Sequence, residues 1–501
     1  MSNLEIGIAS FPILMGLIFL RVPIGLAMFL VALGGLFAIT DGWTVALARL
    51  KHETYSTFSN YSLSIVPMFL LMGHFATLGG MSTALFKAAE AWLGHRKGGV
   101  AMASVGACAG FGAICGSSLA TAATMSQVAL PELRRYGYSG GFSTATLAAG
   151  GTLGILIPPS VVLVIYAILT DQNIAKLFLA AFVPGILAAI GYMITINIYA
   201  RLHPEAAGAR DPVPMRERVR ALIDVWPVLA VFSLVVGGIY LGWFTPTAGA
   251  AVGAAGTGLI ALCKGGMGWK ALEGAFHATA RNTAMIFFII LGAAFYNGFL
   301  ALSQAPQALS EWVIGLGLSP WSVLICILLL YLVFGCLMDS LSMILLTIPI
   351  FFPIISQLDF NFVSLAALQA DAAREVLASG IPDGMTAEML GSIETAIASG
   401  QELSRDMMRA LDINITQGRA NRIEAEEVAI WFGILVLIVV EVGLITPPVG
   451  MNLFVINAMD PRTRMSETYR AVLYFVGSDV VRVAVLVAFP GITLFLLRWL
   501  H

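Results

Sequence analysis

The sequence predicts an all-α polytopic membrane protein built as an inverted repeat, with two re-entrant hairpins and two broken helices. Of its 501 residues, 58% are apolar and 11% are charged, whereas about a quarter of residues are charged in soluble domains. The mean hydropathy is +0.89, so the chain carries more apolar surface than a soluble domain of this length could bury. The inverted repeat is indicated by a pair of interrupted apolar segments that recurs in each half of the chain.

Eight segments are long and apolar enough to be ordinary membrane spans. A helix needs about 20 apolar residues to cross a bilayer, because each residue rises ~1.5 Å through a hydrocarbon core of ~30 Å. On this basis we expect spans at residues 5–20, 24–40, 57–79, 176–200, 225–243, 246–263, 283–302 and 473–499.

Basic residues indicate which side of the membrane each loop faces, since Lys and Arg accumulate in cytoplasmic loops. No Lys or Arg occurs between Arg281 and Arg374, so the loops of that region are expected to be periplasmic. Alternating sides through every span places both termini in the periplasm. The exception is the 41–56 loop, which would be periplasmic although it contains Arg49 and Lys51. The basic loops lie at residues 95–97, 134–135, 201–220, 264–281 and 462–470.

Two apolar segments are too long for a single span and are predicted to be re-entrant hairpins. Segment 99–131 has basic residues at both ends, so both ends should be cytoplasmic and the tip should lie at 112–118. Segment 321–357 has a similar length and an interrupted middle at 335–340, but no basic residue at either end. It is therefore predicted to enter from the opposite side. The alternative, two short crossing helices in each segment, would misplace several basic loops.

Each predicted hairpin is followed by an apolar segment that is broken at a Pro-Pro pair, at 141–170 and at 429–457. From Gly116 to Pro158 the distance is 42 residues, and from Asp339 to Pro447 it is 108. The difference of 66 corresponds to a polar stretch in the second half. Hairpins from opposite sides with matched breaks are typical of an inverted-topology repeat. The predicted division is a first repeat at 1–200, a cytoplasmic linker at 201–224, and a second repeat at 225–501 that contains a periplasmic helical insertion at 359–428.

The four breaks are expected to meet near the middle of the membrane and to form a binding site. Irregular backbone is tolerated there only where it is buried in protein or lines a watery cavity. Free carbonyl and hydroxyl oxygens suit a small hard cation, and the N-termini of half-helices can face an anionic substrate. The candidate ligands of the cation or substrate are Ser117, Ser118, Thr121, Gly151 and Thr152 in the first half, and Gly335, Asp339, Ser342, Thr446 and Asn452 in the second.

Asp339 is the sharpest single candidate, because an ionisable residue inside a membrane segment is costly and is functional by default. It could also cap a helix, and the two roles are compatible. Glu441, two residues before the second break, is a weaker case of the same kind. Each Ser or Thr could instead serve helix packing. We see no intramembrane Arg that stands out as a partner for a substrate carboxylate.

Five motifs follow one another along the chain: Met68–Gly73, Gly116–Thr121, Arg134–Tyr138, Gly150–Ser160 and Gly443–Phe454. In this order they resemble the large membrane subunit (DctM type) of tripartite ATP-independent periplasmic (TRAP) transporters. The resemblance extends over essentially the whole chain except the 359–428 insertion. It implies a sodium-driven elevator that imports an organic acid, in which the candidate residues above would bind sodium and the substrate. It also implies two partners, a small four-helix membrane subunit and a periplasmic substrate-binding protein.

The insertion is the departure from the family pattern, and its role stays open. Leu365, Leu368, Ala372 and Leu377 recur near helical spacing, so two or three short helices are expected. Twelve acidic and five basic residues give the insertion a net charge of −7. It would serve either as a docking element for the binding protein or as a solvated decoration.

Two other functions were weighed against the transporter subunit. A stand-alone sodium–carboxylate symporter has similar hairpins, but its relatives carry Asn beside the hairpin Ser and Thr. A membrane subunit of a redox or channel complex would call for paired span histidines or a filter-like loop, and we find neither. The net charge of −2 argues against a nucleic-acid partner. No Walker motif is present, so we do not expect ATP to be the energy source. We expect a transporter subunit and not an enzyme, with no cofactor and with sodium ions as the coupling ions. The protein should lie in the bacterial inner membrane.

Overall fold

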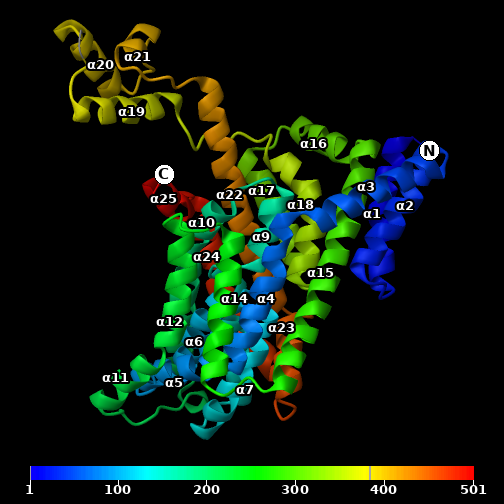
Figure 1. Ribbon diagram of the computed structural model, residues 1–501, viewed down its shortest axis with the longest axis vertical. Coiled ribbons are helices and arrows are strands. Elements are labelled where there is room, and N and C mark those ends of the chain that lie inside the picture. Colours follow the sequence, from blue (N-terminus) through cyan, green and yellow to red (C-terminus); the bar gives the residue numbers. More distant parts are fainter. Residues whose placement is uncertain (1, 383–384, 501) are drawn as a thin grey trace.

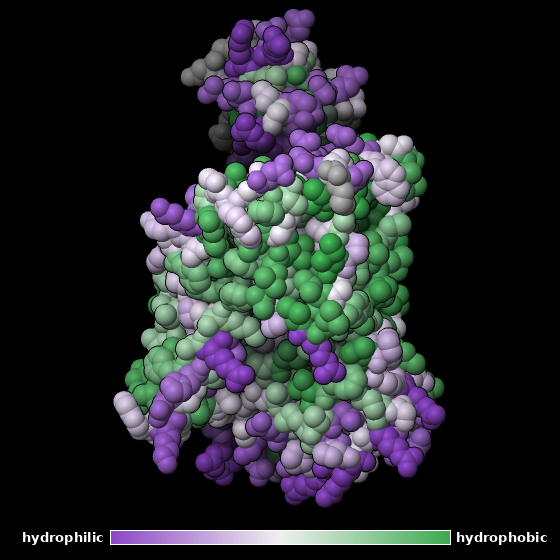
Figure 2. Space-filling view, turned by 90° about the vertical axis from the view of Figure 1, so that its right-hand side faces the viewer, coloured by the Kyte–Doolittle hydropathy of each residue, from purple (hydrophilic) through white to green (hydrophobic). Residues whose placement is uncertain are grey.

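The computed structural model describes residues 2–382 and 385–500, and in these residues it is helical without any strand. Figure 1 shows an elongated helical body with a small group of helices held above one end. On the face shown in Figure 2, a broad apolar band lies between two polar ends. Among the described helices, six are long and apolar enough to cross a membrane, or up to eight if each of two bent pairs is one span. The predicted all-α polytopic class is confirmed.

The described first half of the chain contains two helices long enough to span a membrane, Tyr61–Leu78 (η1 continued by α4) and Ile174–Leu202 (α10), together with the first hairpin and the first broken helix. The elements are α1 (Asn3–Phe19), α2 (Ile24–Thr40), α3 (Trp43–Ser59), the 3₁₀ helix η1 (Tyr61–Ser64), α4 (Ile65–Leu78), α5 (Met81–Leu93), the hairpin α6 (Gly99–Cys115) and α7 (Ser118–Arg135), the broken helix α8 (Gly140–Leu156) and α9 (Val161–Leu169), and α10 (Ile174–Leu202).

The second half contains the second hairpin, the insertion and the second broken helix. The elements are α11 (Met215–Asp224), α12 (Trp226–Phe232), the π-helix η3 (Ser233–Gly237), α13 (Gly238–Tyr240), α14 (Pro246–Cys263), α15 (Trp269–Ser303), α16 (Ala305–Gly315), the hairpin α17 (Pro320–Gly335) and α18 (Ser340–Ile355), the insertion helices α19 (Leu365–Ser379), α20 (Ala387–Ser399) and α21 (Arg405–Ala410), the broken helix α22 (Gln417–Ile445) and α23 (Met451–Met459), α24 (Met465–Ala488) and α25 (Gly491–Leu500). The 3₁₀ helix η2 (Pro204–Ala206) lies in the linker.

Three expectations about individual segments are wrong. The 41–56 loop is the helix α3, in which the polar run from Lys51 to Thr54 lowers the mean hydropathy below that of a span. The 473–499 span is two helices, because Pro490 lies between α24 and α25 and proline removes a helical hydrogen-bond donor. The second broken helix begins before the expected residue 429, since α22 starts at Gln417.

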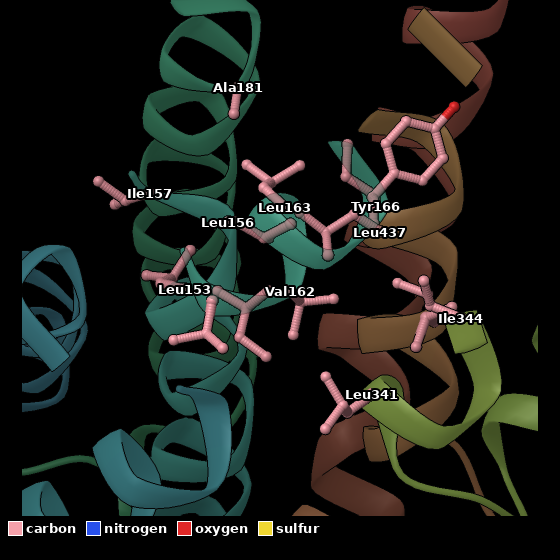
Figure 3. Packing of buried hydrophobic residues seen from close by; sticks show 14 of the residues in the cluster. Leu153, Leu156, Ile157, Val162, Leu163, Tyr166, Ala181, Leu341, Ile344 and Leu437 are labelled. Carbon is pink, nitrogen blue, oxygen red and sulfur yellow. The ribbon is translucent and has the colours of Figure 1, made fainter. Parts of the chain in front are cut away.

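The hairpins and broken helices pack together at the centre of the body. α8 packs against α6, α7 and α24, and α22 packs against α17. Each broken helix also contacts the hairpin of the other half, α9 with α18 and α23 with α7. Figure 3 shows side chains of α8, α9, α18 and α22 gathered around the first break. The contacts therefore correspond between the halves, while their inverted orientation in the membrane stays a prediction.

The insertion has a small hydrophobic core of its own and stands on the projecting end of α22 (Figure 1). At its base, the Glu427 carboxylate accepts two hydrogen bonds from Arg498 of α25, at 2.9 and 2.6 Å. Lys176 of α10 pairs with Glu426 at 2.6 Å, and the Phe362 amide donates to Glu424 at 3.0 Å. These contacts fix the insertion to α10, α22 and α25. The core residues are Ala373, Ile393, Ala396, Leu403 and Leu411.

Candidate functional site

The first hairpin turns at Gly116 and Ser117, between α6 and α7. Gly116 has φ +64°, a left-handed conformation that favours glycine. A Cβ at this position would also lie 3.0 Å from the Pro159 carbonyl oxygen at the first break. The Ser117 hydroxyl accepts a hydrogen bond from the Ala120 amide at 3.4 Å and so caps α7. The tip of the hairpin therefore lies directly against the break of its own half.

The second hairpin turns between Gly335 and Ser340, and Asp339 caps α18. One Asp339 carboxylate oxygen accepts from the Ser342 amide at 3.1 Å. The other accepts from the Ser342 hydroxyl at 2.5 Å. The capping role that we weighed for Asp339 is thus present in the structure. The Asp339 carboxylate is half-exposed at this helix N-terminus.

Glycine pairs bring each hairpin into close contact with its broken helix. A Cβ on Gly112 would lie 2.5 Å from Cα of Gly154, and one on Gly335 would lie 3.1 Å from Cα of Gly443. Both Gly154 and Gly443 lie four residues before the first proline of a Pro-Pro pair, and both Pro-Pro bonds are cis. The same close backbone contact therefore occurs at both breaks.

Three of the predicted residues are buried at the first tip and on α23, which packs against α7. Ser118 is 2% exposed, and Thr121 and Asn452 are fully buried. Within the part of the chain that the structure describes, the Thr121 hydroxyl and both amide atoms of Asn452 have no hydrogen-bond partner. A buried polar atom left without a partner costs about 1–3 kcal/mol. These oxygen atoms are available as ligands.

The first-half glycines hold α8 close to α7. A Cβ on Gly151 would lie 2.6 Å from that of Ala122 and 3.2 Å from the Ser118 carbonyl oxygen. A Cβ on Gly154 would lie 2.4 Å from the Thr121 hydroxyl oxygen. Because Gly151 has no side chain, the Ser118 carbonyl of the first hairpin can lie close to α8. This closeness would let oxygen atoms of both elements bind one ion.

Two of the predicted residues have hydroxyls that already form hydrogen bonds within the protein. The Thr446 hydroxyl donates to the Val442 carbonyl at 2.6 Å, within the last turn of α22. The Thr152 hydroxyl donates to the Ala149 carbonyl at 2.6 Å and lies 3.0 Å from the Tyr192 hydroxyl. Thr152 thus belongs to a buried polar network with α10, rather than to the unpartnered oxygens at the first tip.

The sequence analysis missed an ion pair inside the membrane segment α24. Asp479 is 1% exposed, and one of its oxygens lies 2.9 Å from an Arg482 nitrogen. The Tyr192 hydroxyl donates to the other Asp479 oxygen at 2.9 Å, and the Arg482 guanidinium lies 5.6 Å from the Tyr192 ring centre. The expectation that no intramembrane arginine stands out is therefore wrong. The signal was present as an Asp and an Arg three residues apart in an apolar run.

The C-terminal ends of α7 and α23 are joined by an ion pair between Arg134 and Asp460. Asp460 is buried and also accepts a hydrogen bond from the Thr463 hydroxyl at 2.8 Å. On the other half-helix, the Tyr166 hydroxyl of α9 donates to the Ala429 carbonyl of α22 at 2.6 Å. Polar contacts as well as apolar packing thus connect elements of the two halves.

Known proteins resemble this chain along nearly its whole length. The family model described as "Tripartite ATP-independent periplasmic transporter, DctM component" matches residues 11–492. The C4-dicarboxylate TRAP transporter large permease protein DctM of Pseudomonas aeruginosa is 32% identical over 456 residues, which cover 91% of this chain and 90% of that protein. The sialic acid TRAP transporter large permease protein SiaM of Vibrio cholerae is 29% identical over 71% of this chain and 82% of its own length.

A solved structure shares the fold. The crystal structure of the Alcanivorax borkumensis YdaH transporter matches with a TM-score of 0.55 and 14% identity, over 90% of this chain and 88% of that chain. At this identity the match supports the fold alone. The family match covers most of the chain, and the membership expected from the five motifs is confirmed. The chain belongs to the DctM component family of TRAP transporters, as a multi-pass membrane protein that is a large permease subunit and not an enzyme.

Proposed function

We propose that this chain is the permease subunit of a sodium-coupled secondary transporter that imports a small organic acid. The observation that carries the proposal is the set of buried oxygens without hydrogen-bond partners, those of Thr121 and Asn452. Hydroxyl, amide and carbonyl oxygens are ligands for hard cations. A sodium ion would supply the partner that these atoms lack, and its concentration gradient would drive transport.

The substrate is proposed to be an anion that faces the N-termini of α7 and α18. A helix N-terminus carries a partial positive charge and free amide donors, and both of these lie at hairpin tips capped by Ser117 and Asp339. The names of the similar proteins from Pseudomonas aeruginosa and Vibrio cholerae specify C4-dicarboxylates and sialic acid. Both kinds of compound carry carboxylates, so we infer an organic acid as the substrate class.

Two partner proteins and a location are proposed on the basis of family membership. A periplasmic substrate-binding protein would deliver the acid, and a small four-helix membrane subunit would complete the membrane part. The complex would lie in the bacterial inner membrane, with both termini of this chain in the periplasm.

An elevator mechanism is supported by the pattern of contacts. The two hairpins and two broken helices contact one another across the halves, with α9 on α18 and α23 on α7. Among the other helices, α15 packs against α2 and α4, and α14 packs against α4, while α4 and α15 make fewer contacts with the hairpin helices α6 and α18. We propose that the first group moves through the membrane as one body against a scaffold that contains the second.

The test is transport by the reconstituted complex. The binding protein is first screened by thermal shift against a panel of organic acids, and the acid that stabilises it most is used in radiolabelled form. We expect proteoliposomes to accumulate this acid only with the binding protein outside and an inward sodium gradient. Equal uptake with potassium in place of sodium would reject sodium coupling, and uptake without the binding protein would reject the tripartite scheme.

A further inference from the structure

Glu441 is a buried carboxylate that has no structural partner in the described part of the chain. It lies on α22, two residues before the close contact of Gly443 with Gly335. The residue is 1% exposed, and neither carboxylate oxygen has a hydrogen-bond partner. An ionised carboxylate is very costly to bury unless it is paired, so this position requires a compensating group.

The first residues of both hairpin return helices lie at this carboxylate. The side chains of Ser340, which begins α18, and Ser118, which begins α7, interact with the Glu441 carboxyl without reaching hydrogen-bond geometry. Both serines are buried. Two hydroxyl oxygens and two carboxylate oxygens thus converge from three elements. Their residues are separated by more than a hundred positions in the sequence.

No basic side chain in the described part of the chain neutralises Glu441. Among the described residues, no Lys, Arg or His nitrogen lies within 4.0 Å of its carboxylate. The charged residue that acts on it is Asp479, which has the same sign. Arg482 is already paired with Asp479 at 2.9 Å. The local charge therefore favours the entry of an external cation.

We propose that Glu441 is the carboxylate ligand of a sodium ion held between the two hairpin tips, with the Ser118 and Ser340 hydroxyls as further ligands. The inference rests on the proposed sodium coupling and adds a charged ligand to it. An ion at this place contacts both hairpins and α22 at once. Its binding would hold the two tips together on α22, and its release would free them, so one ion would couple the movement of both hairpins.

The experiment compares Glu441→Gln with Glu427→Gln in the purified membrane complex. Both variants remove a largely buried carboxylate from α22, but Glu427 is paired with Arg498 at the base of the insertion. Sodium binding is measured with ²²Na⁺ and by the sodium-dependent rise in melting temperature, with choline as the reference cation. For Glu441→Gln we expect at least a tenfold weaker sodium affinity, about 1.4 kcal/mol, and a Hill coefficient lower by about one. Glu427→Gln should keep both values, and Glu441→Asp should recover part of the affinity.

The outcomes separate this inference from the proposed function. If the unmodified complex binds sodium and Glu441→Gln binds it equally well, the inference is wrong. It is also wrong if Glu441→Gln changes only the pH profile of uptake, since Glu441 would then carry a proton. If the unmodified complex shows no sodium dependence, the proposed sodium coupling fails first. Should Glu441→Gln not fold, the double variant Ser118→Ala with Ser340→Ala replaces it. That variant is expected to weaken sodium affinity several-fold, and unchanged affinity would overturn the proposal.

Discussion

At the scale of single residues, the site is formed by small side chains that leave room and by polar atoms that lack partners. Gly154 leaves space for the Thr121 hydroxyl, and Gly335 leaves space for α22. Asn452 is fully buried with an unsatisfied amide. A site of this kind is ready for an ion without large rearrangement, because its oxygens have no competing hydrogen bonds to break.

Asp339→Asn separates the charge of Asp339 from its capping role. Asn is as good an N-cap residue as Asp, so the hydrogen bond from the Ser342 amide should remain. If Asp339 helps to bind sodium, we expect near-normal expression and a sodium concentration for half-maximal uptake that rises about tenfold. Asp339→Ala should in addition lower stability by about 1 kcal/mol through loss of the cap. Unchanged sodium dependence in Asp339→Asn would leave Asp339 as a cap alone.

Gly154→Ala tests the close approach of the first hairpin to its break. The added Cβ would lie 2.4 Å from the Thr121 hydroxyl oxygen and 2.7 Å from the Ser117 carbonyl oxygen. Overpacking of this kind costs about 1–3 kcal/mol, so the melting temperature should fall and uptake should be lost. Gly34→Ala is the control, because a Cβ there has nothing within 4 Å. Equal behaviour of the two variants would contradict the proposed contact.

At the scale of elements, the insertion is joined to the helices of the proposed moving body. Its chain enters after the hairpin helix α18 and leaves along the broken helix α22. Arg498 of α25 and Lys176 of α10 tie the base of the insertion to two further helices. The insertion should therefore move together with the hairpins, whichever partner it contacts.

Arg498→Gln is expected to loosen the insertion without unfolding the body. The substitution leaves Glu427 largely buried without its bidentate partner, and hydrogen bonds between charged groups are among the stronger ones. Hydrogen exchange measured by mass spectrometry should become faster in residues 417–427, while exchange in α8 stays unchanged. Arg374→Gln is the matched control, since its pair with Asp371 is exposed and worth ~0–1 kcal/mol. Slow exchange in both variants would show that the ion pair is dispensable.

At the scale of the whole molecule, the positions of the termini, the insertion and the linker agree with the membrane sides that the basic loops predict. Both termini and the insertion lie toward one end of the body in Figure 1, and the linker helix α11 lies at the other. The linker carries Arg210, which pairs with Glu90 of α5 at 3.1 Å. Basic loops mark the cytoplasmic side, so the end with the insertion is expected to be periplasmic.

Cysteine labelling in intact cells tests this orientation. Cysteines placed at Ser399 in the insertion and at Glu205 in the linker are both at exposed positions. The background variant replaces the exposed Cys263 and Cys326 with serine. A membrane-impermeant thiol reagent added from the periplasm should label the Ser399 position and should reach the Glu205 position only after the membrane is permeabilised. The reverse pattern would invert the predicted topology.

Features that depend on local composition could be predicted from the amino-acid sequence. Apolar runs determine membrane helices, and Gly, Pro and capping residues determine where they break. The tips at Ser117 and Asp339 and the breaks at the Pro-Pro pairs were therefore predicted at the right places. The amphipathic helix α3 was missed, because its hydropathy averages close to neutral even though its residues have helical order.

Which buried polar atoms have hydrogen-bond partners depends on how the helices pack against one another. The Thr152 hydroxyl bonds to Tyr192 of another helix, whereas the Thr121 hydroxyl has no partner in the described residues. The place of Glu441 beside Ser118 and Ser340 is likewise visible only in the folded chain. These contacts join residues that are far apart in the sequence, and they depend on how the helices pack. Hydropathy and residue spacing describe each helix separately, so they do not show which residues of different helices come into contact.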